Sequence, residues 1–216
     1  MKKSFLILIL GVITITSCDK NPDPVSKVVP VSFPSIVLNG AQIVSTVVGT
    51  GSYSDPGAVG TDDITGVATN LSPVLNNVDL TSPGFYSVKY SMKNSNGYVT
   101  DATRLVLVTS VDAAVDLSGP YHRVSNGQGI TLTKRGPGLY TTDNVGGVAN
   151  NPAYIFDVYI GQINDSQIVV PVQPSALGGD INCDNTTLTI SPVDTAYSYV
   201  VRGSGFGTSV RIFTHD

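Results

Sequence analysis

The stretch Gly84-Phe85-Tyr86-Ser87-Val88-Lys89-Tyr90-Ser91-Met92 decides the fold class. From Tyr86 onward every second residue is apolar, and the residues between them are Ser or Lys. This alternation is typical of a strand with one buried face and one solvated face. Turn residues follow at 94–97, and a second apolar run covers 105–108. The pattern predicts an antiparallel β-hairpin.

The composition extends this prediction to the whole chain. Among 216 residues with a formal net charge of −4, all sixteen acidic residues are Asp, while Val (30) and Thr (21) are abundant. Val and Thr favour strands, whereas Asp, Gly and Pro favour turns. The composition therefore argues against a helical bundle, a coiled coil or a doubly wound α/β enzyme. We expect no nucleic-acid partner, because the chain has no basic stripe to neutralise phosphates.

The N-terminus indicates export. Lys2 and Lys3 precede about nine apolar residues, and this run is too short to span a hydrocarbon core of ~30 Å. The following Ile15-Thr16-Ser17-Cys18 resembles the bacterial lipobox. This resemblance implies that residues 1–17 are a signal peptide and that Cys18 is acylated, which would anchor the chain in the membrane. The alternative is an ordinary cleaved signal with an incidental Cys.

Residues 18–34 are expected to form a tether. Four prolines at positions 22, 24, 30 and 34 oppose helix and favour an extended spacer. The mildly acidic residues after Cys18 resemble the surface-export signal of Bacteroidota lipoproteins, although Lys20 and Pro22 interrupt it. The resemblance implies a lipid-anchored protein of the outer membrane that faces the cell exterior.

Residues 35–110 carry an ordered set of motifs: Leu38-Asn39-Gly40, Tyr53-Ser54-Asp55-Pro56-Gly57-Ala58, Asp62, Pro83-Gly84-x-Tyr86-x-Val88-x-Tyr90, Asn96-Gly97 and Arg104-x-Val106-x-Val108. Together they resemble the bacterial immunoglobulin-like domain found on many surface proteins. Gly84-x-Tyr86 also matches the tyrosine corner of such sandwiches. One departure is Asp62-Asp63-Ile64-Thr65, which lacks the usual Gly. The resemblance implies an N-terminal immunoglobulin-like β-sandwich.

The Asp residues of this region have two interpretations. Asp55-Pro56-Gly57 is turn chemistry, and Tyr53 is expected to pack with its hydroxyl on water or backbone. The alternative is a calcium site formed by Asp55, Asp62 and Asp63, since Ca²⁺ takes six to eight oxygen ligands. No EF-hand spacing is present, so we expect no metal and no cofactor.

A connector at 111–116 leads to a second module at 117–216. Its strand-like segments, separated by Gly, Asn, Asp and Pro, are 129–134, 153–160, 167–172, 186–190, 197–201 and 208–213. Short strands at regular spacing predict a second β-sandwich or a barrel-like domain, so the whole chain is expected to be all-β. Only Ser175-Ala176-Leu177 indicates a helical turn.

A weaker resemblance covers this second module. The segment from Gly138 to Gly147, with Tyr154, the 168–173 strand and Gly203-x-Gly205, is similar to the C-terminal domain of uncharacterised Bacteroidota lipoproteins that pair it with an immunoglobulin-like domain. Such relatives are often encoded with starch-utilisation-type glycan uptake systems. The resemblance implies extracellular polysaccharide or an outer-membrane uptake complex as partner.

The sequence offers little for catalysis. His122 and His215 are the only histidines, and neither Gly-x-Ser-x-Gly nor a P-loop occurs. A glycosidase pair such as Asp143 with Asp157 cannot be supported, because such a pair is defined by its separation in space. We therefore expect a protein that is not an enzyme, with a hydrolase as the remote alternative. Cys183 is expected to be a small, partly buried residue.

Binding is the favoured class. Sugar sites combine aromatic faces with Asp and Asn acceptors, so the candidate glycan-binding residues are Tyr140, Asp143, Asn144 and Tyr159. The alternative is that these tyrosines complete the core, and the absence of Trp favours it. Asp194-Thr195-Ala196 resembles the acceptor of Bacteroidota O-glycosylation, which would modify Thr195.

The prediction from sequence is a non-catalytic surface lipoprotein that binds or helps to take up glycan, with the immunoglobulin-like domain as a spacer. The alternative is a structural or adhesion protein that mediates protein–protein interactions at the cell surface.

Overall fold

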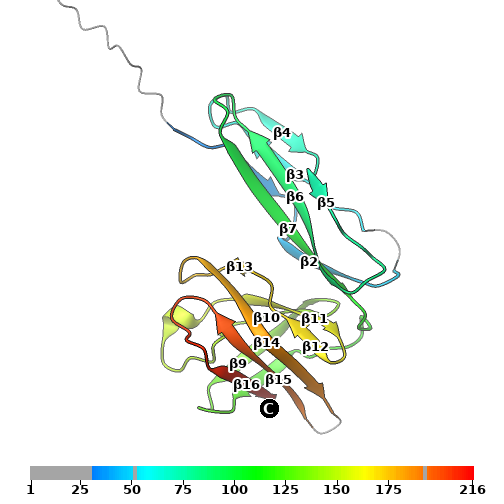
Figure 1. The fold of residues 1–216 in the computed structure, drawn as a ribbon, viewed down its shortest axis with the longest axis vertical. Helices are drawn as coiled ribbons and strands as arrows, with labels where there is room; N and C mark the ends of the chain where they lie inside the picture. Colours follow the sequence, from blue (N-terminus) through cyan, green and yellow to red (C-terminus); the bar gives the residue numbers. More distant parts are fainter. Residues whose placement is uncertain (1–30, 51–52, 192–193) are drawn as a thin grey trace, which may run out of the picture. The chain divides into compact units, whose positions relative to one another are not determined.

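The computed structural model describes residues 31–50, 53–191 and 194–216 (Figure 1). The predicted signal peptide, Cys18 and most of the tether lie outside these residues. Ser32–Asp216 forms one compact unit. Within the described residues the regular structure is β-strand plus a short 3₁₀ helix, and no helix is long and apolar enough to cross a bilayer.

The N-terminal module is a two-sheet sandwich, as predicted. The strands are β1 (Ser35–Leu38), β2 (Ile43–Val47), β3 (Ala58–Thr61), β4 (Ala68–Leu71), β5 (Leu75–Asn76), β6 (Gly84–Lys93) and β7 (Val99–Thr109). One sheet has the order β1-β3-β4 and the other β2-β7-β6-β5. The β2–β7 pair is parallel and the other pairs are antiparallel.

The predicted hairpin is the centre of this module. β6 and β7 pair without a break from Gly84↔Val108 to Lys93↔Val99. Val88 and Tyr90 are fully buried in the core between the sheets. The Tyr86 hydroxyl donates to the carbonyl of Ser82 at 2.8 Å, which is the bond expected of a tyrosine corner.

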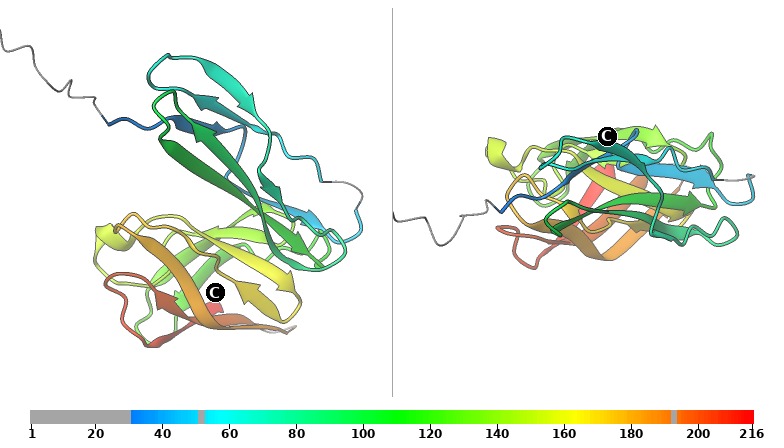
Figure 2. Two further views of the ribbon diagram at one scale, coloured as in Figure 1. Left: turned by 45° about the horizontal axis from the view of Figure 1, so that its top comes forward. Right: turned by 90° about the horizontal axis from the view of Figure 1, so that it is seen from above.

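The C-terminal module is a single curled sheet, a half-barrel (Figure 2). Its strand order is β12-β11-β10-β9-β8-β16-β15-β14-β13, with every neighbouring pair antiparallel. The bounds are β8 (Gly119–Arg123), β9 (Gly129–Gly136), β10 (Leu139–Thr142), β11 (Val158–Asn164), β12 (Gln167–Val169), β13 (Gln173–Pro174), β14 (Asp180–Ile190), β15 (Thr195–Arg202) and β16 (Val210–His215). The curl encloses a core in which four aromatic rings contact one another: Tyr121, Tyr197, Tyr199 and Phe213.

Several details differ from the sequence prediction. The strand expected at 167–172 ends at Val169, and the strand expected at 186–190 begins at Asp180. The strand expected at 153–160 begins only at Val158, because Pro152–Tyr154 forms the 3₁₀ helix η1. Asn151 caps this helix and Pro152 occupies its first turn, where a missing N–H costs nothing. At 175–178 the chain makes a β-turn closed by Gly178 N–H on the Ser175 carbonyl, not a helical turn.

The two modules share an apolar layer. Ile43 and Leu107 of the first module pack with Leu139 and Ile163 of the second. The Thr109 hydroxyl donates to the Gln162 carbonyl at 2.7 Å. The N-terminal module is therefore in direct contact with the half-barrel at the faces of β7, β10 and β11.

Candidate functional site

A groove of about 280 Å³ lies at the edge of this apolar layer, and we call it the Tyr159 groove. Its lining comes from both modules: Gln42, Ile43, Thr103, Leu105, Asp157, Tyr159, Val172, Gln173 and Pro174. These residues come from four separate segments of the sequence, so the groove exists only in the folded chain.

The alternation of β11 places Tyr159 in this groove. Val158 and Ile160 face the core of the half-barrel, so the half-buried Tyr159 between them faces outward. Gln173 fixes the backbone of Tyr159: its side-chain oxygen accepts the Tyr159 N–H at 2.8 Å, and its amide nitrogen donates to the Tyr159 carbonyl at 3.0 Å. The side chain of Gln173 thus makes the two hydrogen bonds with the Tyr159 main chain that a neighbouring strand would otherwise make.

One polar residue of the lining, Asp157, is paired with Arg135, which lies outside the lining. Arg135 donates to the Asp157 carboxylate at 3.0 Å and to the Thr141 hydroxyl at 2.9 Å. The Arg135–Asp157 pair is exposed on both sides, so it remains open to solvent and to a ligand. The site therefore combines a tyrosine ring with a carboxylate that is paired with a neighbouring guanidinium.

The other candidate residues do not reach the groove. Tyr140 is 1% exposed and its hydroxyl accepts the Leu117 N–H, so its ring face is covered by the core. Asn144 is also buried. Its side-chain amide donates to the Val148 carbonyl and accepts the Val148 N–H. The Asp143 carboxylate accepts the Thr131 N–H at 2.9 Å. Tyr140 therefore completes the core, which is the alternative that the sequence left open for these tyrosines.

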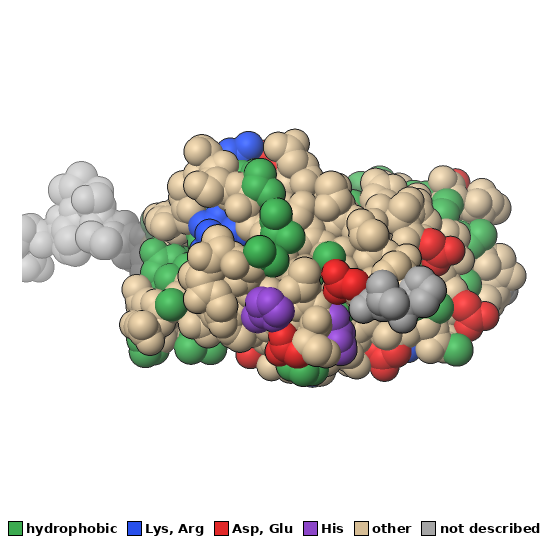
Figure 3. Space-filling model, turned by 90° about the horizontal axis from the view of Figure 1, so that it is seen from below, with side chains coloured by type: hydrophobic (Ala, Val, Ile, Leu, Met, Phe, Trp, Pro, Cys, Tyr) green, Lys and Arg blue, Asp and Glu red, His purple; other side chains and the backbone are tan. Residues whose placement is uncertain are grey.

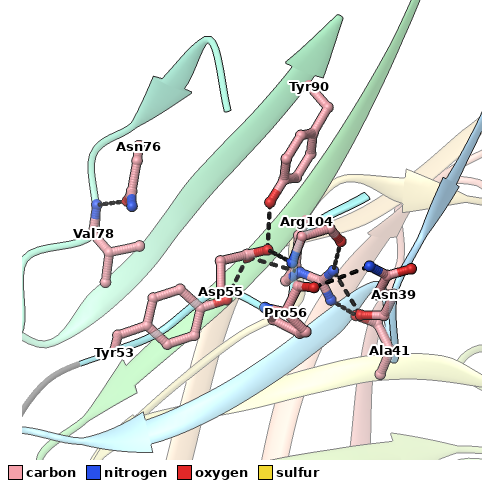
Figure 4. A network of polar contacts seen from close by, with 10 residues as sticks. Asn39, Ala41, Tyr53, Asp55, Pro56, Asn76, Val78, Tyr90 and Arg104 are labelled. Carbon is pink, nitrogen blue, oxygen red and sulfur yellow. Dashed lines mark hydrogen bonds and ion pairs between the residues drawn. The ribbon is translucent and has the colours of Figure 1, made fainter. Parts of the chain in front are cut away.

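The Tyr-x-Asp-Pro-Gly-Ala block forms a second polar cluster (Figure 4). Arg104 is fully buried, and its guanidinium donates to Asp55 at 2.9 Å and to the main-chain carbonyls of Asn39, Ala41 and Gly57. Asp55 also accepts the hydroxyls of Tyr53 and Tyr90 and the Gly57 N–H. The Tyr53 hydroxyl therefore contacts a carboxylate, where water or backbone was expected.

The buried Asp55–Arg104 pair, the tyrosine corner and the two-sheet sandwich together agree with a sequence comparison. Residues 36–108 match the family described as "Bacterial surface protein, Ig-like domain". This segment is an immunoglobulin-like domain.

Two further comparisons concern the whole chain. The crystal structure of the lipoprotein BT2262 from Bacteroides thetaiotaomicron is similar at 19% identity and a TM-score of 0.39, over 85% of this chain and 100% of that one. No curated protein matches the chain.

The three Asp residues of the Ig-like domain that were considered for calcium are engaged by protein donors. Asp62 accepts the N–H groups of Ile64, Thr65 and Ser95, and Asp63 accepts the Asn94 side chain. Asp55 is committed to Arg104 and its neighbours. In the described part of the chain no group of three or more His, Cys or Asp is arranged to hold a metal ion.

Thr195, the predicted modification site, is half-buried at the start of β15. It lines a polar groove of about 300 Å³ together with Asp116, Asp194 and His215. Figure 3 shows the face on which both histidines lie beside acidic side chains. The O-glycosylation of Thr195 stays a prediction.

Cys183 is a buried thiol in the half-barrel. Burial raises its pKa to about 12, so the thiol is protonated and inert at neutral pH. The sequence predicted a small, partly buried residue, and the structure buries it more deeply.

Proposed function

We propose that this chain is a non-catalytic lipoprotein of the cell surface whose Tyr159 groove binds a sugar unit of an extracellular polysaccharide. The observation that supports this most directly is the position of Tyr159. Among the four candidate residues, it is the one that lines a groove open to solvent. The polysaccharide, or an uptake complex that handles it, is the proposed partner.

The chemistry of the groove fits a sugar. A pyranose presents C–H groups on its faces and hydroxyls around its edge, and an amphipathic tyrosine ring packs against such a face. Asp157 and Gln42 supply a carboxylate and an amide for the hydroxyls. The groove is small and shallow, so we expect weak binding of one or two sugar units and gain in affinity through repeated sites on a polymer.

The location of the protein rests on two separate observations. Residues 1–18 have the order of a lipoprotein signal, and the Ig-like domain belongs to a type described from bacterial surface proteins. Contact between the Ig-like domain and the half-barrel at β7 and β11 gives the domain a second role beside that of spacer, because Gln42 and Thr103 line the groove.

Affinity electrophoresis of residues 19–216 in gels that contain single polysaccharides tests this proposal. We expect one or more polysaccharides to retard the wild-type chain and Tyr159→Ala to lose most of that retardation. Tyr98→Ala is the matched control, since Tyr98 lies on the Ig-like domain beside Phe33, away from the groove. The proposal is wrong if no polysaccharide retards the wild-type chain. It is also wrong if Tyr159→Ala and Tyr98→Ala are retarded to the same extent. Release of soluble sugar during incubation would instead indicate a hydrolase.

A further inference from the structure

Half of strand β7 has an unpaired edge. β6 pairs with β7 over its whole length, from Val99 to Val108. On the opposite side β2 pairs only with residues 105–109 of β7. Strand β1 lies near β7 but pairs with β3 in the other sheet. The segment 99–104 is therefore open along one side.

The alternation of the strand identifies which groups point to this open side. The Leu105 N–H donates to the Gln42 carbonyl at 2.9 Å, so residue 105 points away from β6. In a strand the N–H and C=O of one residue point the same way, and this direction alternates along the chain. Asp101 and Thr103 must then present their N–H and C=O groups to the open side.

The partner strand confirms this assignment. Ser87 and Lys89, which lie opposite Leu105 and Thr103, direct their main-chain groups away from β7: the Ser87 N–H bonds Asn77 and the Lys89 carbonyl accepts the Val74 N–H. Among the described residues nothing forms a main-chain hydrogen bond with Asp101 or Thr103 on the open side.

A groove of about 430 Å³ runs along this edge, and we call it the β7-edge groove. It is lined by Ile36, Leu38, Gly40, Gln42, Asp101, Ala102 and Thr103. Its wall on the β1 side is apolar, and Lys89 pairs with the Asp101 carboxylate at 2.7 Å, which neutralises the charge at the rim. Gln42 and Thr103 also line the Tyr159 groove, so the two grooves adjoin.

We propose that the β7-edge groove is a strand-addition site that takes an extended, largely uncharged segment of another polypeptide. Two N–H and two C=O groups in strand spacing match the main chain of such a segment, which would extend the β2-β7-β6-β5 sheet. Side chains of the segment on the β1 side would contact Ile36 and Leu38. A second copy is a poorer fit, because its own edge is recessed in the same groove. The inference does not depend on sugar binding at Tyr159.

Selection from a displayed library of linear peptides tests the proposal. The target is the chain from residue 18 with Cys18→Ser, and the counter-target is the same chain with Thr103→Pro. Proline is tolerated on an edge strand where its N–H faces outward, and here it removes a donor of the open side without breaking the β6 ladder. Thr103→Ser keeps the N–H and is the control. We expect peptides that bind the target and Thr103→Ser equally and Thr103→Pro at least tenfold more weakly.

Amide hydrogen exchange supplies a readout that needs no variant. In the free chain the Asp101 and Thr103 amides should exchange fast while that of Ala102, which is bonded to β6, is protected. A selected peptide should then slow exchange at Asp101 and Thr103. Slow exchange without peptide would show that the edge is already covered, by a second copy or by the tether, and would overturn the proposal. A library that yields no binding peptides would also overturn the proposal. The same holds for peptides that bind the Thr103→Pro chain as tightly as the target. Polysaccharide that slows these two amides would also overturn it.

Discussion

At the scale of single residues, the Asp55–Arg104 pair is the most consequential contact of the Ig-like domain. Both side chains are buried, and the guanidinium donates four hydrogen bonds, to Asp55 and to three main-chain carbonyls. A buried ion pair contributes little net stability compared with an apolar pair, but removal of one partner leaves a bare charge in the core. The network therefore makes Asp55 hard to replace.

We predict that Asp55→Ala lowers the free energy of unfolding by about 3 to 5 kcal/mol, because it leaves Arg104 buried without its counter-ion. Asp184→Ala is the control: it breaks the exposed pair with Arg202 at 2.6 Å and should cost under about 1 kcal/mol. Urea titration measured by circular dichroism gives both values. Equal losses in the two variants would contradict this account of Asp55.

The same carboxylate makes the domain sensitive to acid. Burial by itself would raise the pKa of Asp55, but hydrogen bonds from Tyr90, Tyr53 and the Gly57 amide, together with Arg104, lower it below the usual 3.8. A lowered folded-state pKa contributes stability above the usual value, and this contribution is lost as the pH falls through the folded pKa.

We therefore expect the stability difference between the wild-type chain and Asp55→Asn to be largest near neutral pH and to shrink below about pH 4. Urea titrations between pH 7 and pH 2.5 measure it. A difference that is constant across this range would show that Asp55 does not titrate with unfolding.

At the scale of elements, the hairpin β6–β7 was predicted and β11 only in part. Strict alternation and turn residues determine the hairpin locally. The start of β11 depends on the 3₁₀ helix at Pro152, which replaces the first part of a strand-like sequence. The orientation of the Tyr140 side chain toward the core depends on how β10 pairs with β9 and β11. Local pattern is reliable where the two faces of a strand differ, and it fails where the residues do not alternate between apolar and polar, as in β10.

Gly161 on β11 provides a test of how closely the strands of the two modules approach. A Cβ at this position would lie 2.6 Å from the Phe85 ring and 3.2 Å from Leu107. We predict that Gly161→Val lowers the free energy of unfolding by about 1 to 3 kcal/mol through overpacking. Gly129→Val on β9 is the matched control, since its Cβ would meet nothing within 4 Å, and it should change stability by less than about 0.5 kcal/mol. If both variants are equally stable, β6 and β11 are not in contact.

At the scale of the whole molecule, the apolar layer of Ile43, Leu107, Leu139 and Ile163 places two sequence-distant modules in one unit. The Tyr159 groove adjoins this layer and is lined by residues of both modules, whereas the β7-edge groove is lined by the Ig-like domain. We infer that ligand binding at the Tyr159 groove depends on the integrity of the Ig-like domain as well as of the half-barrel.

The proposed membrane anchor belongs to the scale of the whole molecule, and Cys18 is the residue that tests it. We predict that the native chain partitions into the detergent phase of a Triton X-114 extraction, and that Cys18→Ser moves it to the aqueous phase, because acyl chains supply the membrane affinity. Cys183→Ser is the control and should stay in the detergent phase, since that thiol is buried. Detergent partition of Cys18→Ser would refute the lipid anchor.

The sequence by itself determined the all-β class, the Ig-like sandwich, its hairpin and its tyrosine corner, because alternation and turn chemistry act between residues close in the chain. Only the tertiary structure decided which tyrosine faces a groove, which carboxylates are engaged and which strand edge stays unpaired. Each of these depends on segments that are far apart in the chain, such as those of Gln42 and Tyr159, which line the same groove. No local pattern records such arrangements, since the packing of distant segments creates them.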